Sequence, residues 1–269
     1  MDLQRGGWCV AVATSVLLLA SARGWAEERE HFQLKLGATY DQGDFGTSNT
    51  TRTVFAPLTL KYLGDRFDLG LTASFVHIET AGGVTLIDGT PTRTAGAQRR
   101  QTSESGVGDT LLKGRYFLID DPGPTSPLPA FTPFVKIKAP TADETRNLGT
   151  GETDYGFGLE VDKQLGAFFL FGDASYTVIG SPPGQDLRNR PAASVGVGAK
   201  LSDTVTVSGL VDWRRAVVKG RDDPADLVGI LTYKLTRTIS LNPYASVGLT
   251  DGSPDFGVGF ELAYKFGRY

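Results

Sequence analysis

The residues with the clearest chemical potential in this chain are ionised side chains that alternate with apolar ones. Glu160 stands between Leu159 and Val161, and a single isoleucine separates Lys136 from Lys138. Ionised groups of both signs on one face can bind and orient a solute, or they can pair with one another and fill the interior. The candidates for this role are Asp109, Lys113, Arg115, Lys136, Lys138, Glu160, Asp162, Asp173, Lys200, Asp212, Arg214, Lys234, Glu261 and Lys265.

The alternation itself is typical of β-strands, whose side chains point in turn to opposite faces. One face is apolar and aromatic, and the other holds glycine, hydroxyl and charged residues. Most segments have roughly the ten residues that a tilted transmembrane strand requires. About 12 strands are predicted, at residues 31–40, 54–62, 67–75, 110–118, 131–139, 155–161, 168–178, 193–201, 205–213, 227–235, 239–249 and 256–266.

The connections between these strands alternate in length. The short ones are residues 63–66, 165–167, 202–204 and 236–238. The long ones are residues 41–51, 80–105, 140–153, 180–191 and 218–226. Outer-membrane barrels have short periplasmic turns and long external loops, so both termini are expected in the periplasm. Residues 120–129 are long and proline-rich where a short turn is due, and we expect an extended, rigid turn there. Loop 80–105 has three open interpretations: it folds inward as a constriction, it contacts lipopolysaccharide, or it is merely a mobile loop.

The placement of aromatic and charged residues indicates which face meets lipid. Aromatic residues gather near the strand ends of the apolar face, as in the two interfacial rings of membrane barrels. An Arg or Lys facing lipid at mid-bilayer would cost about 2–4 kcal/mol, so the charged face is expected inside. The predicted fold class is all-β, a transmembrane up-and-down antiparallel β-barrel at residues 27–269. A secreted soluble β-sandwich is the alternative.

The first 26 residues have the features of a cleaved secretory signal peptide. Arg5 precedes an apolar run at residues 8–20, and small residues surround the expected cleavage after Ala26. The chain's only cysteine, Cys9, lies in this segment, so disulfides are not expected to hold the mature fold. The formal net charge of −3 and the lack of a long basic run give no indication of nucleic acid as a partner.

Several ordered motifs resemble a known family. They are GVGDTLLKGRY from Gly106, FVKIKAPTADE from Phe134, LGTGETDYGFGLEVDKQLG from Leu148, YTVIGSPPGQDLRN from Tyr176 and GLTDGSPDFGVGFELAYKF from Gly248. Together they resemble the Gram-negative outer-membrane family named for the MetA pathway of phenol degradation. That resemblance implies transport of small organic molecules and supplies no catalytic residue to carry over.

Enzymatic chemistry has little support in the sequence. The two histidines are His31, at a strand start, and His77, which shares the outward parity of Phe75. The residue two positions after His77 is Glu79, so the His-x-Ser spacing of outer-membrane phospholipases is absent. The Gly-x-Gly pairs do not fit the dinucleotide-binding pattern. We therefore expect no enzyme activity, no cofactor and no metal.

The predicted function is an outer-membrane channel for passive or facilitated uptake of small aromatic or hydrophobic molecules through a charged lumen. Two alternatives stay open: a non-conducting structural or interaction barrel, and an outer-membrane lipid-modifying enzyme. The expected partners are outer-membrane lipids, lipopolysaccharide and the solute. Cations on residues 111–118 and 134–138, facing carboxylates on the next two strands, further suggest an electric field across the lumen.

Overall fold

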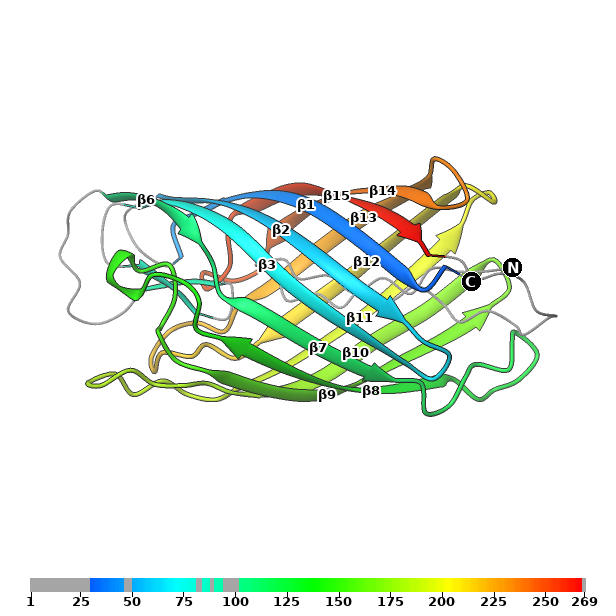
Figure 1. The fold of residues 1–269 in the computed structure, drawn as a ribbon, viewed down its shortest axis with the longest axis horizontal. Coiled ribbons are helices and arrows are strands. Elements are labelled where there is room, and N and C mark those ends of the chain that lie inside the picture. The colour runs from blue at the N-terminus through cyan, green and yellow to red at the C-terminus, as the bar shows by residue number, and fades with distance from the viewer. Residues whose placement is uncertain (1–29, 46–49, 81–83, 88–89, 94–101, 268–269) are drawn as a thin grey trace.

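A computed structural model describes residues 30–45, 50–80, 84–87, 90–93 and 102–267 of the chain (Figure 1). The predicted signal peptide lies outside the described residues. The strands are β1 (Phe32–Gly43), β2 (Thr51–Leu63), β3 (Phe67–Thr80), β4 (Val84–Ile87), β5 (Thr90–Arg93), β6 (Thr102–Val107), β7 (Thr110–Tyr116), β8 (Ala130–Ala139), β9 (Asp154–Leu165), β10 (Phe168–Val178), β11 (Arg190–Lys200), β12 (Val205–Arg214), β13 (Ala225–Lys234), β14 (Ile239–Gly248) and β15 (Phe256–Phe266).

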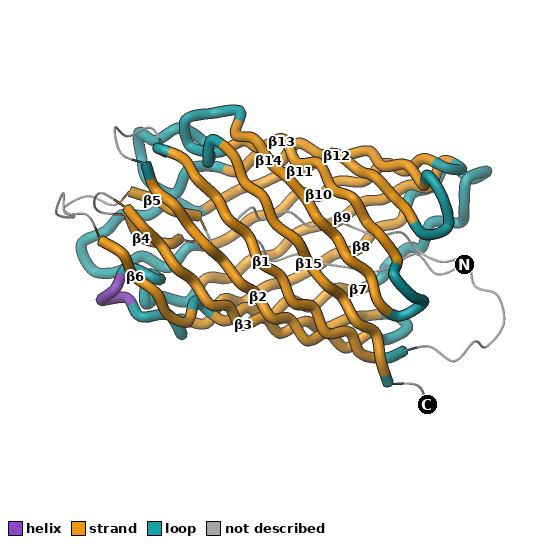
Figure 2. The backbone as a smooth tube through the Cα atoms, turned by 90° about the horizontal axis from the view of Figure 1, so that it is seen from above, coloured by secondary structure: helices purple, strands orange, loops and turns teal. Residues whose placement is uncertain are grey.

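The large sheet closes on itself as a barrel. Each strand pairs antiparallel with its neighbours, and β1 pairs with both β2 and β15. β6 and β7 both pair with β3 and form one interrupted strand, which gives 12 strands around the barrel. The prediction of a 12-stranded antiparallel barrel is therefore confirmed. Figure 2 shows the strong tilt of the strands against the long axis, which closure of a sheet requires.

The interruption between β6 and β7 is a β-bulge. Phe75 pairs with Val107, but Thr72 pairs with Leu111, so one extra residue enters the β7 side. The backbone N–H of Gly108 still donates to the carbonyl of Ser74 at 2.9 Å. An extra residue exchanges the two faces of a strand. The simple alternation therefore ends at the bulge, and the predicted loop 80–105 is wrong at both ends, where β3 and β6 extend the barrel.

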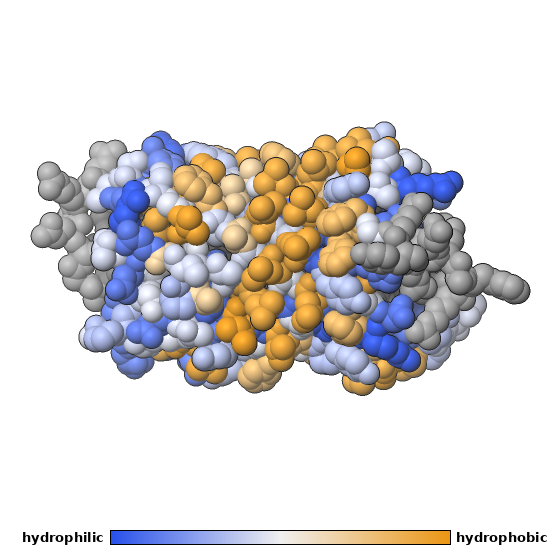
Figure 3. Space-filling model, viewed as in Figure 1, coloured by the Kyte–Doolittle hydropathy of each residue, from blue (hydrophilic) through white to orange (hydrophobic). Residues whose placement is uncertain are grey.

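Side chains sort between the two faces as expected for a membrane barrel. Phe157 and Leu159 are 57% and 37% exposed, whereas Glu160, the next residue of the same strand, is fully buried. Apolar residues cover the middle of the face seen in Figure 3, and hydrophilic residues gather toward both ends. The interior therefore holds the polar groups, and the outer surface matches a lipid environment.

The long turn between β7 and β8 is held together by one ion pair. Lys163 of β9 binds Asp121, and its Nζ also donates to the carbonyl oxygens of Gly123 at 2.8 Å and Leu128 at 3.2 Å. The backbone N–H groups of Gly123 and Gln164 donate to the Asp121 carboxylate at 2.9 and 2.6 Å. These contacts hold the long turn against the end of β9, at a position where membrane barrels usually have a short turn.

We expect Lys163→Met to lower the free energy of unfolding by about 1–3 kcal/mol, because it removes hydrogen bonds from a charged group. Burial alone would raise the pKa of Asp121, but the hydrogen bonds from Lys163, Gln164 and Gly123 lower it below its ordinary 3.8. A lowered carboxyl pKa stabilises the fold above the unfolded pKa and loses that effect as the pH falls through the folded pKa.

Urea unfolding in detergent micelles at several pH values measures this contribution. The difference between wild type and Lys163→Met is expected at neutral pH and should shrink below pH 3.8. Lys219→Met is the matched control, because Lys219 and its partner Asp186 are 68% and 79% exposed. Equal losses for both variants would show that the turn contacts are not stabilising.

Candidate functional site in the barrel lumen

The structure buries or half-buries every charged residue singled out in the sequence. The buried ones are Arg115, Lys138, Glu160, Asp162, Asp212, Arg214 and Glu261. The half-buried ones are Asp109, Lys113, Lys136, Asp173, Lys200, Lys234 and Lys265. A barrel buries such groups only in its lumen. Whether they contact a passing solute stays a prediction.

Arg115 is the centre of an ion-pair network that joins β2, β3, β7 and β9. Its Nε donates to Asp68 Oδ1 at 2.9 Å, and its Nη1 donates to Glu160 Oε2 at 3.2 Å. Lys113 Nζ reaches the other oxygen of Glu160 at 2.8 Å, and Lys61 Nζ lies 3.5 Å from Asp68 Oδ2. Because all five side chains are buried or half-buried, the network holds this side of the lumen together.

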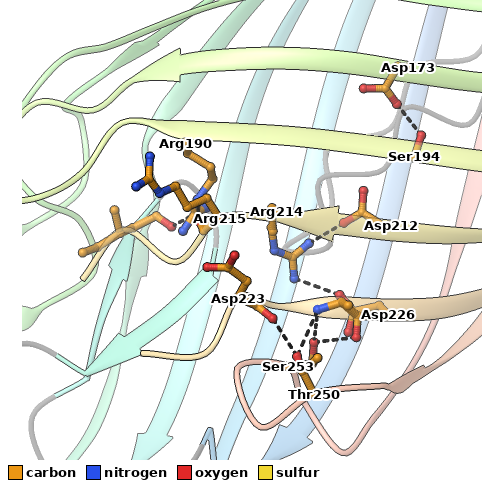
Figure 4. Close-up of polar contacts among 12 residues, drawn as sticks. Asp173, Arg190, Ser194, Asp212, Arg214, Arg215, Asp223, Asp226, Thr250 and Ser253 are labelled. Carbon is orange, nitrogen blue, oxygen red and sulfur yellow. Dashed lines mark hydrogen bonds and ion pairs between the residues drawn. The ribbon is translucent and has the colours of Figure 1, made fainter. Parts of the chain in front are cut away.

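A second set of pairs lies near the opposite ends of the strands, at the external loops. Lys138 Nζ is 3.0 Å from both Asp109 Oδ2 and Asp154 Oδ2. Figure 4 shows Arg214 between two carboxylates, with Nη1 2.9 Å from Asp212 and Nη2 3.0 Å from Asp226. Here the carboxylates outnumber the cations, so the group is net acidic.

The lumen charge therefore varies along the barrel axis more than across it. Ionised residues near the external strand ends include Asp41, Lys138, Asp154, Arg190, Asp212, Arg214 and Asp226. Those near the periplasmic ends include Lys35, Lys61, Asp68, Arg115, Lys200, Lys234 and Lys265. The sequence suggests an electric field across the lumen, between a cationic side and an anionic side. The structure weakens this interpretation, because Asp68, Asp109 and Asp154 lie among the cations and neutralise them.

Sequence reasoning missed several members of these networks although the signal was present. Lys35, Lys61, Asp68, Asp154 and Asp226 have the inward parity of their strands, yet they were not selected as candidates. Lys35 pairs with Glu261 at 3.0 Å along the β1–β15 wall. Extending the alternation of inward and outward positions along each strand would have identified all five residues as facing the lumen.

An apolar band on the inner wall was also missed. Phe169 and Phe171 of β10 are 1% and 3% exposed, and their rings lie 5.8 Å apart over Gly196 and Gly198 of β11. A Cβ at either glycine would collide with a ring, at 2.3 Å for Gly196 and 2.0 Å for Gly198. Further inward apolar side chains on β8, β12 and β13 are Phe134, Leu210, Val228 and Ile230. The signal is apolar runs without alternation, such as residues 168–171.

The hairpin β4–β5 closes the external mouth with apolar contacts. Val84 and Leu86 pack with Val76, Ile78 and Leu148 on one side of the mouth. On the other side, Ile87 packs with Ile179, Leu187 and Val217 from the β10–β11 and β12–β13 loops. Part of loop 80–105 thus folds inward, as one interpretation of the sequence held. Residues 81–83, 88–89 and 94–101 lie outside the described residues.

Hydrogen bonds hold this hairpin to the barrel. The Leu86 N–H donates to the carbonyl of Asn147 at 3.2 Å, and the Thr85 hydroxyl donates to Asn147 Oδ1 at the same distance. On the far side, Arg190 Nη1 reaches the carbonyl of Ile87 at 3.5 Å. Apolar side chains of the hairpin therefore cover the polar lumen at this end of the barrel.

His77 lies on the outer surface near the external rim, as its parity indicated. The His-x-Ser spacing is absent along the chain, but β6 brings Ser105 opposite His77 from the neighbouring strand. His77 Nδ1 is 2.6 Å from Ser105 Oγ, and Nε2 is 3.5 Å from Glu79 Oε1. Glu79 is in turn 3.6 Å from Arg52 Nη1, so an exposed ion pair competes for its carboxylate.

Two acidic loops, residues 221–226 and 251–255, meet at one open cleft. Asp222, Asp223 and Asp251 line it together with Trp213, and its volume is about 560 Å³. Within the described part of the chain, no three His, Cys, Asp or Glu residues are grouped so as to hold a metal ion. Among the described residues, no helix is long and apolar enough to cross a membrane.

A closed barrel with an apolar exterior and a polar lumen defines an outer-membrane β-barrel protein. The chain belongs to the family described as "Putative MetA-pathway of phenol degradation", whose sequence model matches residues 37–266. The resemblance seen in the sequence motifs is thereby confirmed. A search of curated protein sequences finds no match.

Solved structures with a similar fold serve different purposes. The COG4313 outer membrane channel from Pseudomonas putida F1 is 13% identical with a TM-score of 0.69, covering 90% of this chain and 97% of that chain. The translocator domain of the autotransporter NalP from Neisseria meningitidis is 10% identical, with a TM-score of 0.53 and 88% of each chain covered. The NanC porin is 10% identical with a TM-score of 0.51, covering 87% of this chain and 99% of that chain. These likenesses show the fold, and the activity must be argued from the lumen.

Proposed function

We propose that this protein is a channel for passive or facilitated uptake of small aromatic or hydrophobic molecules. The observation that carries the proposal is the set of apolar side chains at the mouth and on the inner wall of an otherwise charged lumen. The hairpin β4–β5 forms an apolar entrance, and Phe169 and Phe171 lie on the inner wall behind it. An aromatic side chain over glycines offers a flat surface on which a ring can stack at little steric cost.

The mechanism is diffusion down a concentration gradient, with brief contacts that are weak enough to release the solute. The lumen charges are neutralised largely by one another, so they frame the route rather than block it with uncompensated charge. Membership of the MetA-pathway family and the likeness to outer-membrane channels support a transport role. The proposal also places the outer rim against lipopolysaccharide, the lipid of the outer leaflet.

Reversal potentials in planar bilayers test aromatic preference. Benzyltrimethylammonium and tetraethylammonium carry the same charge, have similar size and cross lipid poorly, but only the first has an aromatic ring. We expect wild-type protein to prefer the aromatic cation by about threefold or more, as a ring–ring contact contributes about 0.5–1.5 kcal/mol.

The double variant Phe169→Ala and Phe171→Ala should lose this preference. The matched control is Phe168→Ala, because Phe168 is 59% exposed on the outer face of the same strand. Equal permeability of the two cations in wild type would contradict the proposal, and so would an unchanged preference in the double variant.

A further inference from the structure

We propose that the route is selective for aromatic solutes that carry a hydrogen-bond donor, and that Asp41 and Asn242 accept that donor. This inference rests on the proposed function and names its substrate class. It comes from a contrast between two walls of the lumen. One wall carries the apolar band, and the facing wall carries a run of buried oxygen atoms without hydrogen-bond partners.

The facing wall is formed by β14, β15, β1 and β2, which are consecutive in the barrel. Within the described residues, six buried oxygen atoms there lack a hydrogen-bond partner: Gln33 Oε1, both Asp41 carboxylate oxygens, Thr53 Oγ1, Ser240 Oγ and Asn242 Oδ1. Each of these five residues is at most 2% exposed. Leaving a buried polar atom unpaired costs about 1–3 kcal/mol, so a run of such atoms indicates a surface that meets other partners in use.

These atoms are arranged along the barrel axis. Gln33 and Ser240 lie near the periplasmic ends of β1 and β14. Asn242 is the next inward-facing residue of β14 after Ser240. Asp41 and Thr53 face each other near the external ends of β1 and β2. Together they mark a polar strip through the barrel rather than a single pocket.

The chemistry of the strip favours donors. Carboxylate and amide oxygens accept hydrogen bonds only. The orientation of Asn242 is set by its Nδ2, which donates to the Glu261 carbonyl at 3.4 Å. A solute that presents N–H or O–H groups therefore matches this wall.

The backbone beside Asp41 leaves space for its carboxylate. Gly257 faces Asp41 across the β1–β15 ladder, and a Cβ at Gly257 would lie 2.3 Å from Asp41 Oδ1 and 2.6 Å from Ser246 Oγ. A glycine at this position lets the carboxylate lean along the wall without a competing side chain. No ion pair to Asp41 is formed within the described residues, in contrast to Asp212 and Asp226, which bind Arg214.

Two other lumen carboxylates are engaged by cations, and the opposite wall is partly apolar. Asp68 and Glu160 are engaged by Arg115, Lys61 and Lys113. Phe169 and Phe171 supply the apolar surface of the opposite wall. A ring on one side of a solute would match the apolar wall, and an ammonium or hydroxyl group on its other side would match Asp41 and Asn242.

Cysteine accessibility tests where the route runs, without requiring conduction. Single cysteines at Ser240 and Asn242, in a Cys9→Ser background, are compared with a cysteine at Thr132, a buried residue of β8 on the opposite wall. We expect a small water-soluble methanethiosulfonate reagent to modify the first two about tenfold faster, which corresponds to 1.4 kcal/mol of easier access. Equal rates at the three positions would overturn the assignment of the route.

Permeation ratios test the donor preference. Benzylammonium has three N–H donors, whereas benzyltrimethylammonium has the same charge and none. We expect Asp41→Asn and Asn242→Leu to reduce the preference for benzylammonium by about threefold or more, as expected for loss of one hydrogen bond. Thr132→Val, on the opposite wall, should leave the ratio unchanged.

The outcomes separate the two proposals. If wild-type protein passes both aromatic cations and the ratio is unchanged in Asp41→Asn and Asn242→Leu, the donor preference is wrong while the aromatic channel stands. If wild type passes neither cation, the channel proposal fails. The cysteine rates then still decide which wall is accessible.

Discussion

Arg115→Met is expected to destabilise the barrel by about 3–5 kcal/mol, because it leaves buried carboxylates without their cation. Arg115 donates hydrogen bonds to both Asp68 and Glu160, and Glu160 is fully buried. Lys61 and Lys113 remain as partners, but Lys61 stands 3.5 Å from Asp68. Methionine replaces the apolar stem of the arginine but not its guanidinium, so the loss reports mainly the unpaired charge. Urea unfolding in micelles, followed by tryptophan fluorescence, measures it.

The matched control is Arg66→Met. Arg66 lies 4.0 Å from Asp120, and the two side chains are 51% and 41% exposed. An exposed pair contributes about 0–1 kcal/mol, so this variant should unfold almost as wild type does. The double variant Arg115→Met with Asp68→Asn should regain part of the loss, because one of the unpaired charges is gone. A loss below 1 kcal/mol for Arg115→Met would mean that the network is solvated and not stabilising.

Ile87→Asp is expected to widen the external entrance and raise single-channel conductance by about twofold or more, because the narrowest section dominates the resistance of a pore. Ile87 is fully buried against Ile179, Leu187 and Val217. A carboxylate at this place loses these apolar contacts and draws water or the nearby Arg190 toward it, so this side of the hairpin should loosen. Planar-bilayer recording of wild type and variant measures the change.

Ile87→Val is the control for the entrance, because it keeps the contact apolar while it removes one methyl group. Its conductance should equal that of wild type. Heat-modified mobility on gels shows whether each variant is a folded barrel. Unchanged conductance in a folded Ile87→Asp barrel would show that the hairpin is not the constriction.

The barrel could be predicted from the sequence because lipid imposes a strict rule on every strand. Leu159 faces lipid and Glu160 faces inward, so the period of two is visible without knowledge of tertiary contacts. Short turns and long loops then give the orientation. The rule fails where a bulge exchanges the faces, as at Gly108, because one extra residue carries no distinct signal in composition.

The lumen was predictable only in part. Parity places Lys113, Arg115 and Glu160 inside, yet it cannot tell that they bind one another across β8, which depends on strand order and tilt. Inward phenylalanines such as Phe169 break the polar pattern of their face, so they were not selected from the sequence as lumen residues. The position of the β4–β5 hairpin could not be predicted from the sequence, because it is determined by contacts with loops that are distant in the chain.

Recording wild-type protein in a planar bilayer tests most directly whether the lumen is open. We expect discrete conductance steps that persist in purified, detergent-extracted protein and that carry benzyltrimethylammonium current. A folded barrel that inserts into the bilayer but gives no current with either small salt ions or this cation would contradict a channel and favour a closed structural barrel.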